Sequence, residues 1–517
     1  MALIGIDLGT TFCAVASLDD RGRPATLPNR DGEMLTPSAV YLGPDDTAVV
    51  GQPAMDLAQE QPDRVATMMK RRMGLPDLGH PVAGRPFRPE TLSAVILRKL
   101  ANDAAAQLGP VTQCVITVPA YFDDTRRKAT MDAGRIAGLE VIDILDEPSA
   151  AALAYSLQPG VGDGPSPPPS PLTVLVYDLG GGTFDVTVVR LAKKRFQVLA
   201  IEGDVRLGGY DWDDRLVNWA ADKFAQRYAA DPRDDPQSLA MLRAAAERAK
   251  RTLSKVEQAT LTAAHAGNRL VLPLSRADFE ALTKDLLVRT RLTTQEVLKQ
   301  AGLTWAGVDK VLMVGGSTHM PATGRMLAEL TGKEPDRSLA VSEVVARGAA
   351  VHAGIVRRRE ERIRGGADRP LELLADVIEI SVNAHSLGVE VKEKTGGRLN
   401  DKLIAKNTQL PAAVSRVYYT VGDHQARVRV RILQGEAQQA EACIAVGECW
   451  IDGLPPDLPK GSPVQVRCGV AANGRIEVMA LDMTSGRTAT AEIHRPGGLT
   501  EAQIAAEAAW VRGLKIQ

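Results

Sequence analysis

The sequence predicts an α/β domain over roughly the first 350 residues and a smaller antiparallel β domain behind it. In the first part a β-rich run at 114–122 is followed by a helical pattern at 125–139, and this interleaving is typical of α/β domains. The chain changes character after a charge-dense stretch at 355–376. Beyond it, apolar and polar residues alternate in 426–436 and 462–470, which predicts antiparallel strands.

Composition excludes several classes of protein. The chain has 517 residues, with 62 Lys and Arg against 63 Asp and Glu, so its charge offers no reason to expect nucleic acid or an anionic membrane as partner. No apolar run reaches the roughly 18 residues of a membrane helix, and Asp7 interrupts the apolar N-terminus, which disfavours a signal peptide. Five cysteines predict free thiols rather than disulfides or a metal site, and hence a cytoplasmic location.

Two further segments stand apart from the regular pattern. The Pro-rich run at 159–171 is expected to be a surface loop within the first domain. A helical pattern begins at Leu499 and continues to the last residues given.

Two short segments of the first domain resemble each other, at residues 4–11 and 176–183. Each is an apolar β run, then an aspartate (Asp7 or Asp178), then a tight turn of glycine and threonine. Glycine lets backbone N–H groups approach an anion closely, and an aspartate at a strand end can hold a hydrated divalent cation. Two such hairpins facing each other predict a site for a polyphosphate and its metal ion.

A third glycine turn lies at 310–321, where Gly315 and Gly316 follow a buried-looking strand that could support a flat nucleoside. A helical pattern before it places four polar side chains on one face. For this face two interpretations stay open: a solvated surface with one ion pair, or donors and acceptors for a ribose and base. The four residues are Glu247, Lys250, Arg251 and Ser254.

Taken together, these segments resemble the 70-kilodalton heat-shock chaperone family, the DnaK-like proteins. The shared stretches include residues 118–155, 207–217 and 430–436, and the resemblance runs from residue 2 to about 510. It implies an actin-like ATPase of two lobes, built from duplicated ribonuclease-H-like domains, followed by a β-sandwich that binds extended peptides. The chain looks like a divergent member that lacks the C-terminal helical lid, so bound peptide is expected to leave quickly.

The resemblance also divides the chain into parts. It implies an ATPase domain at 1–358, an interdomain linker at 359–385, a β-sandwich at 386–497 and a short C-terminal helix, the remnant of a lid, at 498–517.

Matched by position, the resemblance implies residues for binding ATP or ADP. The first phosphate turn is Gly9, Thr10 and Thr11, and the second is Gly180, Gly181, Gly182 and Thr183. The nucleoside residues are Gly208, Gly209, Glu247, Lys250, Arg251, Ser254, Gly315, Gly316 and Ser317.

Hydrolysis needs a positioned water, a metal ion on the phosphates and positive charge near the leaving group. By resemblance, Asp7 and Asp178 would hold Mg²⁺ through water, and K⁺ is a further implied ion. Lys70 would supply the charge, and Glu147 or Asp185 would orient or deprotonate the water. The implied catalytic residues are Lys70, Glu147, Asp178, Thr183 and Asp185, and the implied interlobe relay residues are Pro119 and Arg127.

Some positions depart from the family pattern. His319, Ser342 and Tyr210 replace residues usual near the nucleoside, which alters that pocket while the phosphate end is intact. Asp143 replaces an arginine that the family uses to engage J-domain co-chaperones, so dependence on an ordinary J-domain protein is in doubt. The linker equivalent is either 371–376 or 377–381.

In the β domain, the peptide site is expected along 387–391 and 418–430, where an extended chain could add to the sheet. For each candidate, plain sandwich core is an equally weighted alternative. The candidates are Val389, Val391, Tyr418, Val421, Val428 and Val430.

The sequence therefore predicts an ATP-dependent chaperone, an ATPase whose hydrolysis is coupled to binding and release of unfolded polypeptide clients. A J-domain co-chaperone and a nucleotide-exchange factor are its possible partners. One alternative is an ATP-binding scaffold or regulator that hydrolyses weakly. Another is a small-molecule kinase on the same fold, which the β-sandwich argues against.

Overall fold

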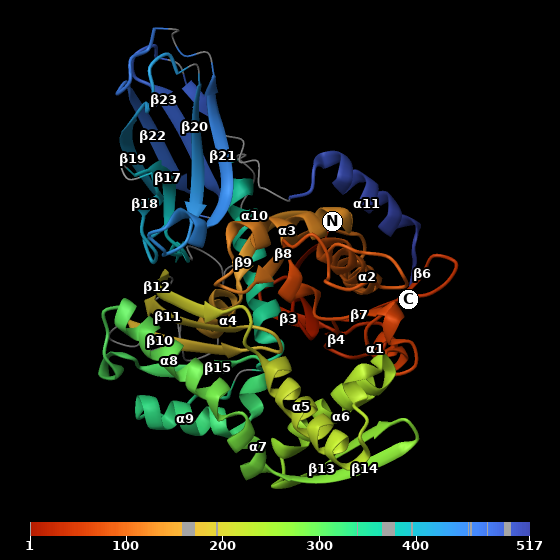
Figure 1. Ribbon diagram of the computed structural model, residues 1–517. Helices are drawn as coiled ribbons and strands as arrows, with labels where there is room; N and C mark the ends of the chain where they lie inside the picture. The colour runs from red at the N-terminus through yellow and green to blue at the C-terminus, as the bar shows by residue number, and fades with distance from the viewer. Residues whose placement is uncertain are drawn as a thin grey trace.

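The computed structural model describes residues 2–157, 171–192, 195–338, 340–363, 378–393, 396–425, 427–452, 454, 457–472, 474–486, 488–490 and 498–517. Two mixed sheets form the core of the α/β part (Figure 1). The first has the order β3-β2-β1-β8-β9, with β4 beside β2, and the second has the order β15-β10-β11-β12-β16. The strands of the first sheet are β1 (Ala2–Leu8), β2 (Phe12–Leu18), β3 (Pro24–Leu27), β4 (Thr36–Pro37), β8 (Val111–Val118) and β9 (Glu140–Asp146). Those of the second are β10 (Leu172–Leu179), β11 (Phe184–Ala192), β12 (Arg195–Asp204), β15 (Lys310–Val314) and β16 (Ile378–Ile380).

The two sheets repeat one arrangement. In the first, β1 forms an antiparallel hairpin with β2 and pairs in parallel with β8. In the second, β10 forms an antiparallel hairpin with β11 and pairs in parallel with β15. The duplication predicted from residues 4–11 and 176–183 is therefore confirmed, and each repeat carries its Gly–Thr turn at the tip of the hairpin. We call the two halves the first lobe and the second lobe.

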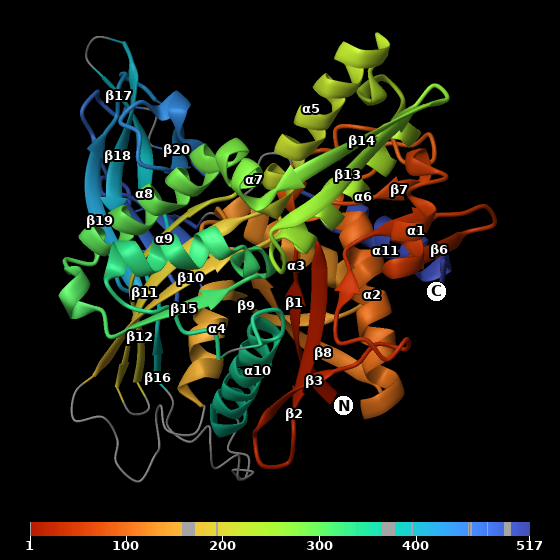
Figure 2. The same ribbon diagram turned by 90° about the horizontal axis from the view of Figure 1, so that it is seen from below.

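Helices α4 (Glu147–Ser156) and α10 (Val344–Ile363) lie between the two sheets (Figure 2). Small residues let them approach closely. A side chain at Gly5 of β1 would overlap the backbone of Ala350, and one at Gly348 would overlap the backbone of Ala150. Only glycine fits at such distances, so these contacts set how the lobes meet.

Further helices cover the outer faces. On the first lobe, α2 (Pro89–Leu108) and α3 (Asp124–Ile136) pack against each other, and a short sheet carries α1 (Gln52–Leu57). The strands of that sheet are β5 (Val40–Leu42), β6 (Thr47–Val50) and β7 (Val65–Ala66), and the turn that follows it is η2 (Met69–Arg72). The second lobe carries α5 (Gly209–Tyr228), α6 (Pro236–Leu253), β13 (Gln258–His265), β14 (Asn268–Ser275), α7 (Arg276–Leu282), α8 (Lys284–Gln300), η5 (Gly316–His319) and α9 (Pro321–Thr331).

The predicted β domain is a sandwich of two antiparallel sheets, β18-β17-β20-β21 and β19-β22-β23-β24. The alternation in 426–436 has the predicted sense, because Val430 and Ile432 are buried while Arg427 and Arg429 are exposed. The strands are β17 (Leu387–Lys392), β18 (Arg398–Ile404), β19 (Ala412–Tyr419), β20 (Arg427–Gln434), β21 (Ile444–Asp452), β22 (Pro463–Val470), β23 (Ile476–Asp482) and β24 (Thr488–Thr490). The expected architecture, a two-lobed α/β part with duplicated sheets followed by a β-sandwich, is thus confirmed.

The connection between the two parts differs from a plain linker. Helix α10 continues to Ile363, beyond the expected start of the linker at 359, and β16 adds to the second sheet by parallel pairing with β12. Of the two linker alternatives, 371–376 lies outside the described residues, as does nearly all of the Pro-rich run at 159–171. The other alternative, 377–381, contains β16.

The C-terminal helix α11 (Glu501–Gly513) lies on the first lobe and not over the sandwich (Figure 1). Its apolar residues Ile504 and Val511 join the core of that lobe, and the Trp510 ring lies 5.3 Å from the Phe87 ring. Strand β25 (Lys515–Ile516) then pairs in parallel with β6. The helix expected as the remnant of a lid is therefore part of the ATPase half, because its apolar face finds partners there.

Among the described residues, no helix has the length and apolar character needed to cross a bilayer. The five cysteines are free thiols, as expected. Cys443 is half-buried, and the other four, Cys13, Cys114, Cys449 and Cys468, are buried. In the described part of the chain, no group of three or more His, Cys, Asp or Glu side chains is arranged to hold a metal ion.

We expect Ile504→Ala to weaken the attachment of α11. Removing a buried Ile side chain costs about 2–5 kcal/mol, and local opening should become easier by that amount. Amide hydrogen exchange of Lys515 and Gln517, whose N–H groups bond to Asp46 and Ala48, measures it. Arg512→Ala, an exposed position on the same helix, is the control and should change little. Unchanged exchange in Ile504→Ala would contradict this packing.

Candidate functional site

The two Gly–Thr turns face each other in close contact across the interface between the two lobes, which we call the cleft. A side chain at Gly181 would overlap Thr11, and one at Gly182 would overlap Thr10. Glycine is therefore required here by close approach of the opposite turn. The structure brings together the residues assigned to the two phosphate turns, Gly9, Thr10, Thr11, Gly180, Gly181, Gly182 and Thr183, from hairpins far apart in sequence.

Beneath the turns lies a buried cluster of carboxylates around one lysine. Lys70, in η2, donates a short hydrogen bond to Glu147 at the start of α4. Burial lowers the pKa of Lys70, but Glu147 and Asp7 more than compensate, and the net shift is upward. The lysine is thus held as a cation inside the protein.

The carboxylates of this cluster outnumber the positive charge that Lys70 supplies, and they repel one another. Burial, followed by repulsion from Glu147, raises the pKa of Asp7 to about 7. The same two causes raise the pKa of Asp178 and of Asp185 well above the usual range. Asp7 accepts a hydrogen bond of 3.1 Å from the Thr117 hydroxyl, and Asp185 accepts one of 3.1 Å from the Tyr121 N–H. A divalent cation would relieve this repulsion, and hard carboxylate oxygens suit Mg²⁺.

The second lobe closes the site with a further glycine pair. A side chain at Gly208 would lie 2.5 Å from the backbone of Gly182, and one at Gly209 would overlap the Ser317 hydroxyl. Ser317 donates 2.9 Å to the carbonyl of Gly180. Gly208, Gly209 and Ser317 therefore pack directly against the second phosphate turn. Gly315 stands with its backbone at positive φ beside Asp178.

The polar face of α6 divides between the two interpretations left open above. Lys250 turns inward, donating 3.0 Å to the Gly209 carbonyl and 2.6 Å to Asp213. Glu247 and Arg251 form a loose pair at 3.7 Å toward solvent. Ser254 donates to the Lys250 carbonyl at 3.2 Å. The face thus carries both a surface ion pair and a group aimed at the glycine turns.

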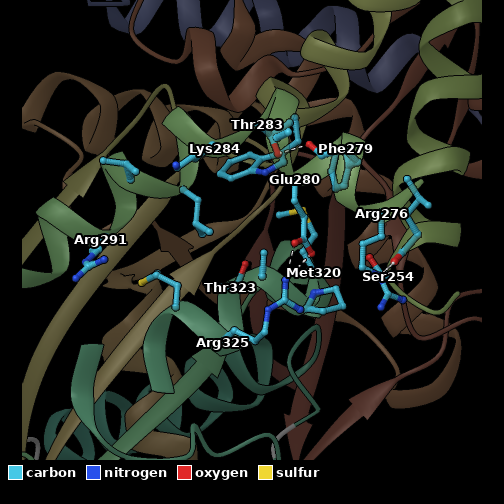
Figure 3. Close-up of a pocket in the computed structure, with 18 of the residues that line it drawn as sticks. Ser254, Arg276, Phe279, Glu280, Thr283, Lys284, Arg291, Met320, Thr323 and Arg325 are labelled. Atoms are coloured by element: carbon cyan, nitrogen blue, oxygen red, sulfur yellow. Dashed lines mark hydrogen bonds and ion pairs between the residues drawn. The ribbon is translucent and has the colours of Figure 1, made fainter. Parts of the chain in front are cut away.

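A cavity of about 390 Å³ opens beside this face, between α7, α8 and the start of α9 (Figure 3). Among the predicted nucleoside residues it is lined by Ser254 alone. Its walls are largely apolar, with Phe279 and Met320, and its rim carries the Arg325–Glu280 ion pair at 2.6 Å. The cavity adjoins the predicted nucleoside residues without containing most of them.

Sequence reasoning missed two residues here. Asp213 is the buried partner of Lys250, and its pKa is raised to about 6, chiefly by burial. Arg71 follows Lys70 and donates 2.7 Å to the Gly182 carbonyl across the cleft. Arg71 lies in a basic run and Asp213 in an acidic one. Neither has a spacing that marks its partner, so only the folded chain reveals either role.

The predicted relay residue Arg127 pairs closely with Asp146, next to Glu147, and also donates to the Phe122 carbonyl at 3.2 Å. Pro119 stands at the end of β8, and the Phe122 N–H bonds to its carbonyl at 3.1 Å. Tyr121, in the loop after β8, connects the carboxylate cluster to the residues that begin the sandwich. Its N–H bonds to Asp185, and its carbonyl accepts from His385 Nε2 at 3.0 Å.

The peptide-site candidates do not behave alike. Val389 and Val430 are 4% and 3% exposed and belong to the sandwich core, whereas Val421 is 63% exposed. Val391, Tyr418 and Val428 are half-buried, and the Tyr418 hydroxyl donates 2.8 Å to Asp401. The six candidates thus divide between the sandwich core and more accessible positions. The edge strand β19 adds exposed apolar side chains that were not singled out, Val417 and Tyr419.

The chain is similar in sequence to known proteins of one family. A family model described as Hsp70 protein matches residues 3–80 and 76–509. The chaperone protein DnaK of Thermus thermophilus is 39% identical to this chain, and the alignment covers 97% of this chain and 82% of that protein.

We expect Lys70→Ala to reduce ATP hydrolysis by about 10²-fold or more, since preorganised charge at a developing anion is typically worth that much. Nucleotide should still bind through the glycine turns. Single-turnover hydrolysis and equilibrium binding of a fluorescent ADP analogue measure the two effects.

Arg72→Ala is the matched control, because Arg72 lies in the same turn but donates to the Asp77 carbonyl at 3.4 Å, away from the carboxylates. Its hydrolysis rate should stay close to that of the unmodified protein. A Lys70→Ala protein that hydrolyses ATP at the unmodified rate would refute the role given to Lys70.

Proposed function

This chain belongs to the Hsp70 family and is an ATP-dependent chaperone with ATPase activity, and from that premise we propose how its two parts cooperate. Its sandwich binds extended segments of unfolded clients, and ATP in the cleft speeds their release. The observation that carries this proposal is a continuous set of contacts from the carboxylate cluster to the first strands of the sandwich. The division at 1–358, 359–385, 386–497 and 498–517 stays part of the proposal, although α10 continues to Ile363 and the helix within 498–517 packs on the first lobe.

In the cleft, the residues suit hydrolysis of ATP to ADP and phosphate. Asp7 and Asp178 would hold Mg²⁺ through water, and the bound ion supplies charge neutralisation on the β- and γ-oxygens. Lys70 would add its positive charge near the same phosphate groups. Asp185, held by the Tyr121 N–H, orients the attacking water, and Glu147 keeps Lys70 in position. K⁺ stays a prediction of the family resemblance.

In the sandwich, main-chain pairing would give affinity for an extended chain and apolar side chains would give preference for its side chains. Val391, Tyr418, Val421 and Val428 are the accessible members of the predicted set. Val389 and Val430 support the sheet from within. We also propose exposed Tyr419 as a contact, since it continues the same strand.

Several contacts join the ATPase part to the sandwich. His385 bonds to Tyr121, and their rings lie 4.3 Å apart. The Asp124 N–H donates 3.0 Å to Gln434 of β20. Lys406 pairs closely with Glu202 of β12. A shift of Asp185 or Tyr121 on nucleotide binding would therefore reach the strands that carry the proposed peptide site.

The strand β16 is held by an ion triad. His352 on α10 lies 2.9 Å from Asp143 on β9 and 2.7 Å from Glu379 on β16. Burial lowers the pKa of His352, but the two carboxylates raise it to about 10, so the ring is doubly protonated at neutral pH. We propose that this triad fixes β16 to the first sheet and takes the place of the arginine used by the family.

The same triad bears on partners. Because Asp143 is bonded to His352, a J-domain that seeks an arginine there would meet a neutralised carboxylate. We propose that any J-domain partner of this chain binds by a different contact. A nucleotide-exchange factor stays a prediction. The free thiols support the expected cytoplasmic location as a proposal.

The decisive experiment follows the dissociation of a fluorescent unfolded peptide by anisotropy. Mg-ATP should accelerate release several-fold, because nucleotide shifts the population toward the state that binds peptide weakly. Lys70→Ala should show the acceleration without the subsequent return to tight binding. Peptide binding that ATP leaves unchanged would favour the scaffold alternative, and no binding at all would refute the peptide site.

The triad predicts a pH dependence with a definite sign. The pKa of His352 is higher in the folded state, at about 10, than in the unfolded state, at 6.5. The stabilisation that protonated His352 gives is therefore fully present below pH 6.5 and is lost as the pH rises toward 10. We expect the thermal midpoint to fall more steeply between pH 7 and 10 in the unmodified protein than in His352→Gln. His265→Gln, a histidine bonded to Ser238 outside the triad, is the control. Parallel profiles for the protein and His352→Gln would contradict the triad.

A further inference from the structure

Arg71 joins the two lobes at the mouth of the cleft. It lies in η2 beside Lys70, yet its guanidinium reaches the second lobe, where it donates to the Gly182 carbonyl and forms a close ion pair with Asp211. Asp211 in turn accepts 2.8 Å from the Gly208 N–H at the start of α5. One side chain of the first lobe thus contacts the Gly182 turn directly and the Gly208 turn through Asp211.

Tyr210 adds an aromatic surface to this crossing. The guanidinium carbon of Arg71 lies over its ring at 5.2 Å, and that of Arg243 lies over it at 4.7 Å. Arg243 comes from α6 and is held by Asp214 at 2.9 Å. Tyr210 is half-buried, which strengthens attraction between a cation and a ring by excluding water.

The lobes cannot separate without breaking these contacts. Opening the cleft moves η2 away from α5, so the Arg71–Asp211 pair and the Arg71–Tyr210 stacking must both be lost. Because the same arginine bonds to the phosphate turn, its departure also frees the Gly182 carbonyl. The need to break these contacts therefore raises the free energy required to open the cleft and release nucleotide. The contacts within the carboxylate cluster are separate from them.

We propose that Tyr210, with Arg71 and Arg243, holds the cleft closed and sets the rate at which nucleotide leaves. Tyr210 acts as a positioning residue: it touches none of the carboxylates, and it works through Arg71.

The test measures dissociation of a fluorescent ADP analogue from the full chain, chased with excess unlabelled ADP. Tyr210→Leu should release it about tenfold faster, which corresponds to about 1.4 kcal/mol. Tyr210→Phe keeps the ring and should release it at nearly the original rate. Single-turnover hydrolysis should change much less than release, because the step depends on Lys70 and its carboxylates.

Tyr228→Leu is the matched control. Tyr228 lies on the same helix, and Arg227 stacks on it at 5.6 Å within one lobe, so its loss should leave release unchanged. Arg243→Gln removes one of the two cations and gives a second reading should Tyr210→Leu fold poorly; it too should speed release. Release at the original rate in both Tyr210→Leu and Arg243→Gln would overturn the proposal. Equal acceleration in Tyr210→Phe and Tyr210→Leu would do so as well, because the hydroxyl and not the ring would then matter.

Discussion

The structure depends on holding four carboxylates and one ammonium together between the lobes, with only Asp7 of the five groups half-buried and the others buried. Lys70, Glu147, Asp178 and Asp185 are all buried. The ammonium of Lys70 is bonded to Glu147, and its single positive charge does not balance all the carboxylates of the cluster. Buried charges without partners are costly, and the raised pKa values of Asp7 and Asp178 express that cost. A metal ion bound with its nucleotide, as proposed above, would balance this negative charge.

Close packing of small residues makes that arrangement possible. The hairpin turns meet at Gly181 and Gly182 because no side chain separates them from the threonines of the other lobe. Gly5 and Gly348 do the same at the helices between the sheets. If the lobes move relative to each other, they would have to pivot on these closely fitted surfaces, and contacts between the lobes, such as that of Arg71, would then influence the whole cleft.

The sandwich is joined to the ATPase part at both of its ends. Before it, β16 extends the second sheet and is held by the triad of His352. After it, α11 and β25 pack on the first lobe. A domain held in this way has less freedom to swing than one on a single tether. Signals between the cleft and the peptide site thus have short physical routes, through Tyr121 and His385 on one side.

Much of this could be read from local pattern. The duplicated Asp–Gly–Thr turns, the interleaved strand and helix periods, and the change to alternating strands are written in consecutive residues, so the α/β ATPase part, the sandwich and the facing phosphate turns followed from the sequence alone. The family resemblance placed the site residues by position. Local pattern suffices there because backbone conformation and side-chain periodicity are short-range properties.

Only the tertiary structure decided which charges meet. Arg71 with Tyr210, His352 with Glu379, and Asp213 with Lys250 join residues far apart in the chain, and nothing in their spacing marks them as partners. The same holds for α11, whose amphipathic pattern predicted a helix but not the lobe that receives it. Ion pairs and apolar faces are satisfied by whichever surface folding brings near, so their partners are settled by the packing of the whole chain and not by the segment itself.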